Sequence, residues 1–283
     1  MFMINQNNTT QLNMITALPM FIFWIVISAL AIVLIYKQKI TKKKSIIIYL
    51  ISIIIGGIIL GGIPNVVMPI QQILSALGGN AIITSLIPMI IVLIILLLTT
   101  LVFGRIFCGY ACPVGAVQEL ISKIKFKSSI KGQKNIKFKI DISEKTARII
   151  RWSFFAVVIL IIVVWNIALL QLLNPFVGYS FFRDPLAMVL LIPLISLISV
   201  MVLSIFIYRP WCRLLCPFGA LAGFTSRFSK LKYCRTEACT DCGLCEKICP
   251  TQESYKNSSK GECYYCNRCV DICPVDAIKL QKK

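Results

Sequence analysis

The sequence predicts an all-α polytopic membrane protein, with five transmembrane helices in two parallel repeats, followed by a small α+β domain at the C-terminus. Three observations lead to this prediction. The 283 residues are 58% hydrophobic and only 14% charged. One cysteine motif occurs twice at the ends of apolar segments, and a second cysteine pattern occurs twice in the polar tail.

Five apolar runs are long enough to cross a bilayer, since a spanning helix needs about 20 residues. They cover residues 16–36, 45–63, 82–103, 152–173 and 186–208. The first run also has the length of a signal peptide. A signal sequence carries positive charge ahead of its apolar region, and no Lys or Arg precedes this run. We therefore interpret it as a retained transmembrane helix.

The basic residues are sorted to one side of the predicted helices. Except for Arg183, every Lys and Arg lies in one of three stretches: 37–44, 104–151 and the tail from Arg209. Cytoplasmic loops hold the excess of Lys and Arg. We therefore expect a multi-pass protein of the cytoplasmic (inner) membrane, with the N-terminus and the segments from Pro64 and Asn174 outside and the C-terminal tail in the cytoplasm.

The net charge of +19 reflects this topology together with attraction to anionic lipid. The lipid bilayer is therefore the first predicted partner. Nucleic-acid binding is disfavoured, because the Lys-rich stretch 123–139 follows a membrane helix and contains few aromatic residues.

The polar tail contains two copies of one cysteine pattern. Residues 239–250, "CTDCGLCEKICP", and 263–274, "CYYCNRCVDICP", each read C-x2-C-x2-C-x3-C-P. This spacing is that of bacterial ferredoxins, whereas zinc sites use separate C-x2-C pairs around a tetrahedral ion. The tail is therefore predicted to be a two-cluster ferredoxin-like domain with two 4Fe-4S clusters.

In such domains the fourth cysteine of each run binds the other cluster. The predicted ligand sets are Cys239, Cys242, Cys245 and Cys273 for one cluster, and Cys263, Cys266, Cys269 and Cys249 for the other. Cys234 is left over and is predicted to be a free thiol, since disulfides rarely persist in the cytoplasm. A tail this short buries little core, so the clusters are expected to supply much of its folding energy.

A different motif recurs in the membrane part. "RIFCGYACPVGA" (105–116) and "RPWCRLLCPFGA" (209–220) are 104 residues apart and end the third and fifth apolar runs. Both motifs end a helix that runs from outside to inside. The predicted repeats are therefore parallel, related by an axis along the membrane normal.

Four thiols of these motifs are expected to meet at that axis: Cys108, Cys112, Cys212 and Cys216. They predict a third iron–sulfur cluster, of the 4Fe-4S or 2Fe-2S type. Ordinary buried cysteines and a dithiol–disulfide relay are the competing interpretations. Pro113 suits the first turn of a helix, which we expect to be interfacial and amphipathic, with its N-terminal dipole directed at Cys112.

The predicted domain organisation follows from these features. It comprises an N-terminal transmembrane helix and basic loop (1–44), membrane repeat 1 (45–125), a basic cytoplasmic linker (126–148), membrane repeat 2 (149–229) and the two-cluster ferredoxin domain (230–283).

"CGYACPVGA" and "CRLLCPFGA" on membrane helices, followed by a two-cluster ferredoxin tail, resemble the membrane polyferredoxins of the NapH-type group. The resemblance covers residues 45–283. It implies a bacterial or archaeal membrane protein that moves electrons between a quinone/quinol pool and a redox partner protein or subunit. Larger relatives in this group carry further domains, which leaves the role of any single relative open here.

Electron transfer without bond-making on a substrate is the predicted function, and whether the chain is a quinol dehydrogenase subunit is left open. No haem is expected, because the chain has no His and so no bis-His ligation. Arg183 and Asp184 either polarise a quinone carbonyl or form a local salt bridge. The alternative function is an assembly factor or redox-sensing regulator. The direction of electron flow, its donor and its acceptor are not determined by the sequence.

Overall fold

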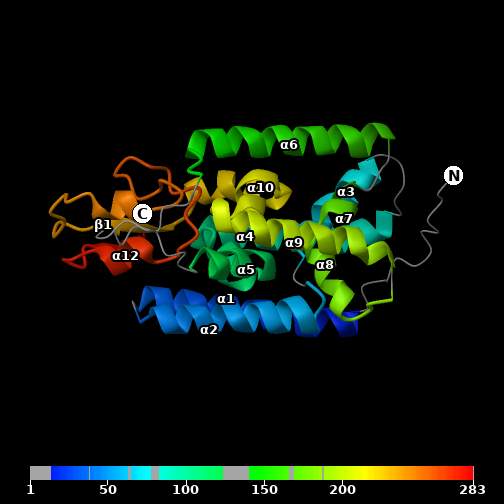
Figure 1. The fold of residues 1–283 in the computed structure, drawn as a ribbon, viewed down its shortest axis with the longest axis horizontal. Helices are drawn as coiled ribbons and strands as arrows, with labels where there is room; N and C mark the ends of the chain where they lie inside the picture. The colour runs from blue at the N-terminus through cyan, green and yellow to red at the C-terminus, as the bar shows by residue number, and fades with distance from the viewer. Residues whose placement is uncertain are drawn as a thin grey trace.

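The computed structural model describes residues 14–37, 39–62, 65–77, 83–123, 140–165, 169–186 and 188–282. The described chain is mostly helical, and its longer helices run along the longest axis of the molecule (Figure 1). These helices are α1 (Met14–Tyr36), α2 (Lys42–Ile51), α4 (Ile83–Phe103), α6 (Glu144–Trp165) and α9 (Leu191–Phe206).

Among the described residues, three helical segments are long and apolar enough to cross a membrane: Leu86–Phe103, Glu144–Trp165 and Met188–Phe206. The apolar stretch Ile22–Tyr36 of α1 is shorter. The second predicted span is divided between α2 and the π-helical segment η2 (Ser52–Ile59). These helices support the prediction of a membrane protein, and the count of five spans stays a prediction.

Helix α6 begins at Glu144, inside the stretch predicted as a linker. Ser143 precedes the helix, and its hydroxyl accepts a hydrogen bond from the Thr146 amide at 3.1 Å, which satisfies one of the amides that a helix start leaves unpaired. Glu144 also pairs with Arg148 at 3.3 Å, one turn along the helix. The linker residues before 140 lie outside the described part of the chain.

The described part of the apolar run 152–173 is helical on both sides of residues 166–168, which lie outside the described chain. Helix α6 ends at Trp165, and α7 (Leu169–Leu173), α8 (Pro175–Gly178) and the 3-10 segment η4 (Tyr179–Phe182) follow. The Asn174 side chain accepts a hydrogen bond from the Phe176 amide at 3.1 Å and caps α8. The segment predicted as an external turn therefore consists of short helices.

These short helices are partly buried rather than fully exposed. Phe176 and Tyr179 are buried, and Asn174 donates a hydrogen bond to Asn65 at 3.2 Å. Arg183 and Asp184 at the end of the segment are both exposed. No ion pair joins these two side chains, both of which the structure describes.

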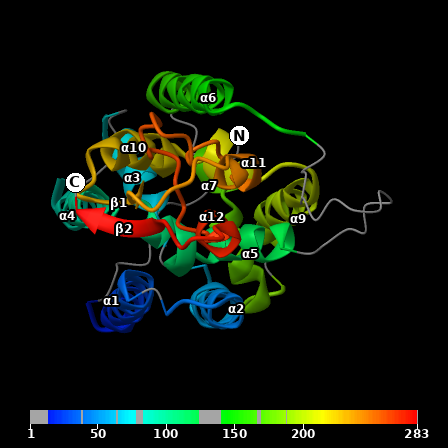
Figure 2. The same ribbon diagram turned by 90° about the vertical axis from the view of Figure 1, so that its left-hand side faces the viewer.

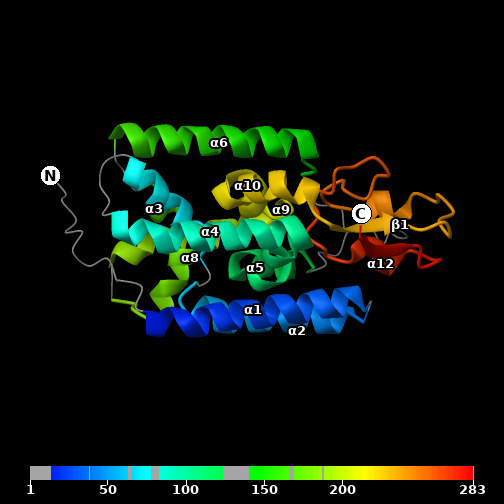
Figure 3. The ribbon, with the colours of Figure 1, turned by 180° about the vertical axis from the view of Figure 1, so that it is seen from behind.

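Helices α5 (Pro113–Ser122) and α10 (Pro217–Thr225) each follow a cysteine motif and begin with proline. The expectation of an interfacial amphipathic helix is wrong for α5. Residues 113–119 are all buried, because α2, η2 and α9 pack around the helix. Figure 3 shows α5 between α4 and α1, close to the end that carries the tail.

The tail forms a small α+β unit at one end of the helical bundle (Figure 1). Strands β1 (Leu231–Arg235) and β2 (Ile278–Lys282) pair antiparallel, with Tyr233 opposite Leu280. Between them lie the short helices α11 (Leu244–Ile248) and α12 (Arg268–Ile272). Seen from this end, the tail lies across the centre of the bundle, with α6 above it and α1 and α2 below (Figure 2).

Candidate functional site

The two membrane motifs have the same local structure. Cys108 and Cys212 lie in the π-helical turns η3 (Phe107–Ala111) and η6 (Trp211–Leu215), whose bounds are 104 residues apart. Cys112 and Cys216 cap the following helices. Their sulfur atoms accept hydrogen bonds from the amides of Gly115 at 3.4 Å and Gly219 at 3.3 Å. The positive N-terminal end of each helix is therefore directed at a cysteine sulfur, as expected for Cys112.

The structure brings the four motif cysteines into one buried group. All four are at most 6% exposed, and Cys112 interacts electrostatically with the other three. Gln118, on the helix after the first motif, donates a hydrogen bond to the sulfur of Cys212 in the second motif at 3.4 Å. The group therefore combines residues from both halves of the chain.

Two arginines that the motif analysis overlooked join the motifs reciprocally. Arg105 donates a hydrogen bond to the Gly219 carbonyl at 3.2 Å, and Arg209 donates one to the Cys108 carbonyl at 2.8 Å. The two arginines are themselves 104 residues apart. The constant offset between the motifs was the sequence signal that could have identified them.

Each arginine has a buried carboxylate as its counter-ion. Nη1 of Arg105 lies 2.6 Å from Glu262, and Nε of Arg209 lies 3.0 Å from Glu119. Burial opposes ionisation of Glu262, but the charges of Arg105 and Arg151 outweigh it and lower the pKa to about 2. Both carboxyl groups are therefore ionised at neutral pH, because Arg268 and Arg209 likewise overcome burial and lower the pKa of Glu119.

The tail contributes to both ion clusters. Glu262 is a tail residue, and Arg151 on α6 binds it at 2.5 Å. The tail residue Arg268 in turn binds Glu119 of α5 at 3.0 Å. The membrane motifs and the tail are therefore joined by buried charges, and not only by chain connectivity.

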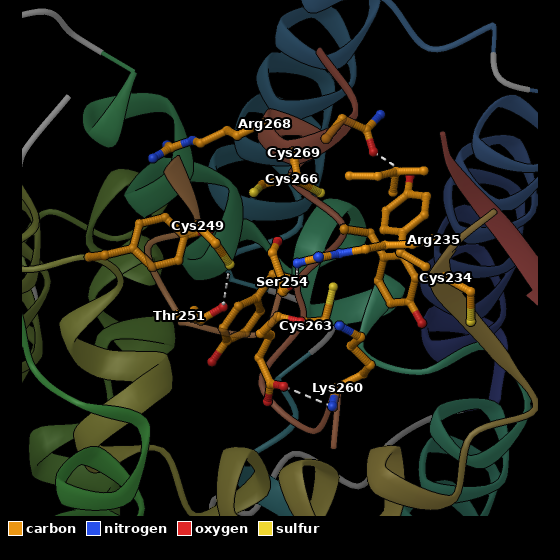
Figure 4. A pocket seen from close by; sticks show the side chains of 17 residues that line it. Cys234, Arg235, Cys249, Thr251, Ser254, Lys260, Cys263, Cys266, Arg268 and Cys269 are labelled. Atoms are coloured by element: carbon orange, nitrogen blue, oxygen red, sulfur yellow. Dashed lines mark hydrogen bonds between the residues drawn. The ribbon is translucent and has the colours of Figure 1, made fainter. Parts of the chain in front are cut away.

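Together with Cys234, four cysteines of the tail motifs line one cavity beside this junction. They are Cys249, Cys263, Cys266 and Cys269, and they belong to both copies of the tail motif (Figure 4). Cys263, Cys266 and Cys269 each interact electrostatically with Cys249. Cys249 directly follows α11, whereas the other three surround the start of α12, so the second copy of the motif takes its fourth cysteine from the first.

A second cavity is lined by Cys239, Cys242, Cys245 and Cys273. Gly243 and Asn267, which precede α11 and α12, both adopt left-handed backbone conformations, with φ of 72° and 62°. This shared turn explains how each C-x2-C-x2-C run wraps around its cavity. Cys242 is exposed, so the second cavity lies closer to solvent than the first.

Cys234 also lines the first cavity, but it belongs to neither copy of the tail motif. It lies on β1 opposite Lys279, and in Figure 4 its sulfur is at the edge of the cavity, away from the sulfurs of Cys249, Cys263, Cys266 and Cys269. Its role as a free thiol stays a prediction.

The residues present fit iron–sulfur clusters. Each of the three groups offers four thiols, the donor set that such clusters take. Within the described residues, the buried charged side chains are five arginines and three glutamates: Arg105, Arg151, Arg209, Arg213, Arg268, Glu119, Glu253 and Glu262. A buried charge requires an opposite charge nearby, and the arginines outnumber the glutamates. Thiolates bound to iron would provide the negative charge that the glutamates do not.

No group of three Cys, Asp or Glu side chains in the described chain is close enough to hold a single metal ion. The cysteines in each of the three groups are spaced more widely than the ligands of a single metal ion. They define the class of protein as an iron–sulfur protein with a membrane-helical part and a ferredoxin-type tail.

Comparison with known proteins agrees with this class. Residues 85–131 and 189–234 both match a family model described as a 4Fe-4S binding domain, and residues 259–279 match a second model of the same description. The chain belongs to the NapH-like ferredoxin-type proteins. The resemblance seen in the sequence is thereby confirmed.

Three relatives illustrate the match. The chain is 32% identical to YccM of Escherichia coli, whose name proposes electron transport, over 62% of this chain and 50% of that protein. It is 30% identical to the uncharacterized protein MJ0750 of Methanocaldococcus jannaschii, over 64% of this chain and 74% of the relative. It is 24% identical to the ferredoxin-type protein NapH of Haemophilus influenzae, over 63% of each chain.

The chain thus spans about half the length of YccM and about three quarters of MJ0750. No solved structure matches the chain significantly.

Proposed function

We propose that this protein is a membrane-bound electron carrier that relays electrons between a quinol pool or a redox partner and the cytoplasmic side of the membrane. The observation that carries the proposal is the close succession of three four-cysteine groups. The membrane group is followed by the cavity that contains Cys263 and then by the cavity that contains Cys242. When bound, iron–sulfur clusters would supply one-electron redox chemistry at all three.

The ligand assignment follows the groups. We assign Cys239, Cys242, Cys245 and Cys273 to one 4Fe-4S cluster, and Cys249, Cys263, Cys266 and Cys269 to the second. Cys108, Cys112, Cys212 and Cys216 are assigned to a third iron–sulfur cluster shared by the two motifs. The matching turns and caps of the motifs support this sharing and support the two parallel repeats.

Tyr264 connects the membrane group to the tail. It follows Cys263 directly in the chain, lines the first cavity and interacts electrostatically with Cys212. The two tail cavities share Arg235 and Ile278 as lining residues. The side chains of this route hold the three groups in position relative to one another, which is a task that a protein performs for its redox centres.

The proposed topology places the membrane group near the cytoplasmic face of the membrane and the two tail cavities in the cytoplasm. The five spans rest on the apolar runs, and the external N-terminus and cytoplasmic tail rest on the distribution of Lys and Arg. The three described membrane-length helices support the membrane location. Relatives named for electron transport, such as YccM, and ferredoxin-type relatives, such as NapH and MauN, support a redox partner protein.

A regulatory role is the second candidate, because two relatives are named as regulatory proteins NosR. Quinol oxidation by the full chain in anaerobic proteoliposomes distinguishes the two, since a carrier turns over and a sensor need not. We expect steady oxidation of a quinol analogue with a soluble acceptor outside, at the tail face. No turnover with any quinol or acceptor, despite full iron content, would favour the regulator.

A further inference from the structure

The helices that follow the two membrane motifs differ at a position that matters for the buried arginines. At the offset of 104 residues, Glu119 on α5 corresponds to Gly223 on α10. Glu119 is the counter-ion of Arg209, the arginine of the second motif. The equivalent arginine of the first motif, Arg105, receives no carboxylate from α10, because glycine has no side chain.

The tail fills this gap. A Cβ atom added to Gly223 would lie 2.8 Å from Oε1 of Glu262 and 2.9 Å from Nη2 of Arg151. The carboxylate of Glu262 therefore occupies the space next to α10 where a side chain of residue 223 would begin. It is the acidic partner of both Arg105 and Arg151.

The backbones also meet closely at this point. A Cβ on Gly261 would lie 2.8 Å from the carbonyl oxygen of Gly223, so no larger residue fits at 261 without movement. The Glu262 side chain is at most 4% exposed, and that of Arg105 is fully buried. A carboxylate held by two buried guanidinium groups forms charge-assisted, shape-specific hydrogen bonds.

We propose that Arg105, Arg151 and Gly223 form a carboxylate socket on the membrane part, and that Glu262 is the positioning residue that docks the ferredoxin tail into it. The socket fits a carboxylate on a flexible side chain. The residue that it binds, Glu262, directly precedes Cys263. Docking thereby fixes the first tail cavity against the membrane group. The inference concerns the docking itself and holds whether the protein is a carrier or a regulator.

The test compares variants of the full chain, purified anaerobically, by hydrogen–deuterium exchange of the backbone amides of residues 259–265. Glu262→Gln keeps the shape and removes the charge. Because charged hydrogen bonds are lost, exchange in this segment should accelerate roughly 10–100-fold. Glu237→Gln removes an exposed carboxylate of the tail and should leave exchange within about twofold, as expected of a surface substitution.

A charge-swap variant separates docking from simple loss of folding. Gly223→Glu alone places two carboxylates in one socket and should accelerate exchange at 259–265 and lower the melting temperature. Gly223→Glu combined with Glu262→Gln returns a counter-ion to Arg105 from α10, as Glu119 does for Arg209. This double variant should recover the melting temperature and wild-type iron content while exchange at 259–265 stays fast.

Two results would overturn the proposal. Unchanged exchange in Glu262→Gln would mean that other contacts dock the tail. Full recovery of slow exchange in the double variant would mean that the socket needs a negative charge from any source and does not position the tail through Glu262.

Discussion

The guanidinium carbon of Arg105 lies 4.4 Å from the ring centroid of Tyr264. The guanidinium carbon of Arg209 lies 4.5 Å from the same ring. One aromatic side chain of the tail is therefore in cation–π contact with the corresponding arginines of both motifs. This places Tyr264 where the two halves of the membrane site meet and where the tail packs against them.

Replacing Tyr264 by Leu should lower the free energy of unfolding by about 2–4 kcal/mol, because a buried ring and two cation–π contacts are lost. Tyr264→Phe is the matched control. It keeps the ring and loses only the 3.5 Å hydrogen bond to Glu262, which is long for a hydroxyl donor. Thermal unfolding of the detergent-solubilised protein measures both. Equal losses for Leu and Phe would show that the hydroxyl, and not the ring, matters.

Arg105→Gln should destabilise the protein by about 3–5 kcal/mol, because it leaves the buried Glu262 short of one counter-charge. Arg148→Gln breaks a partly exposed ion pair, with side chains 33% and 22% exposed, and should change stability by less than about 1 kcal/mol. Chemical unfolding of both variants under the same conditions provides the comparison. Similar small losses at the two positions would contradict a structural role for the buried cluster.

The sequence predicted the tail in more detail than the membrane part. The C-x2-C-x2-C-x3-C-P spacing determines which cysteines are close together, since three of them wrap around one short turn. The membrane-proximal helices were harder to place, because the burial of most of α5 depends on tertiary packing. The helix that starts at Pro113 was expected to lie at the membrane surface, whereas residues 113–119 are all buried.

The ion clusters could not be predicted from local sequence. Glu262 and Arg105 are separated by 157 residues, and neither shows a charge pattern with its sequence neighbours. The one sequence feature that pointed to the ion clusters was the offset of 104 residues between Arg105 and Arg209, which is the offset between the motifs.

A reporter fused after Lys283 should be active only in the cytoplasm, because the tail follows the basic side of the predicted topology. Paired alkaline phosphatase and green fluorescent protein fusions measure this in cells. A matched pair of fusions after Gln72, in the segment predicted to face out, serves as the opposite control. An active phosphatase after Lys283 would reverse the proposed orientation.

Removing iron with a chelator should unfold the tail while leaving the membrane helices folded, because the described tail has little secondary structure of its own, two short strands and two short helices. We expect proteolysis to become rapid between residues 236 and 276 after chelation, and the helical circular dichroism signal to decrease only slightly. A tail that resists protease as well as before would contradict the role of the clusters in its folding.

The most direct test of the central claim asks whether Cys108 and Cys212 belong to one shared iron–sulfur site. Electron paramagnetic resonance of the reduced, anaerobically purified protein, together with iron analysis, makes the measurement, with Cys234→Ser as the control that should change neither. The intact protein should contain about twelve iron atoms with three four-iron clusters, or about ten with a two-iron membrane cluster. Cys108→Ser and Cys212→Ser should each abolish the same signal and leave both tail signals. Loss of different signals, or unchanged iron in Cys108→Ser, would contradict a shared cluster.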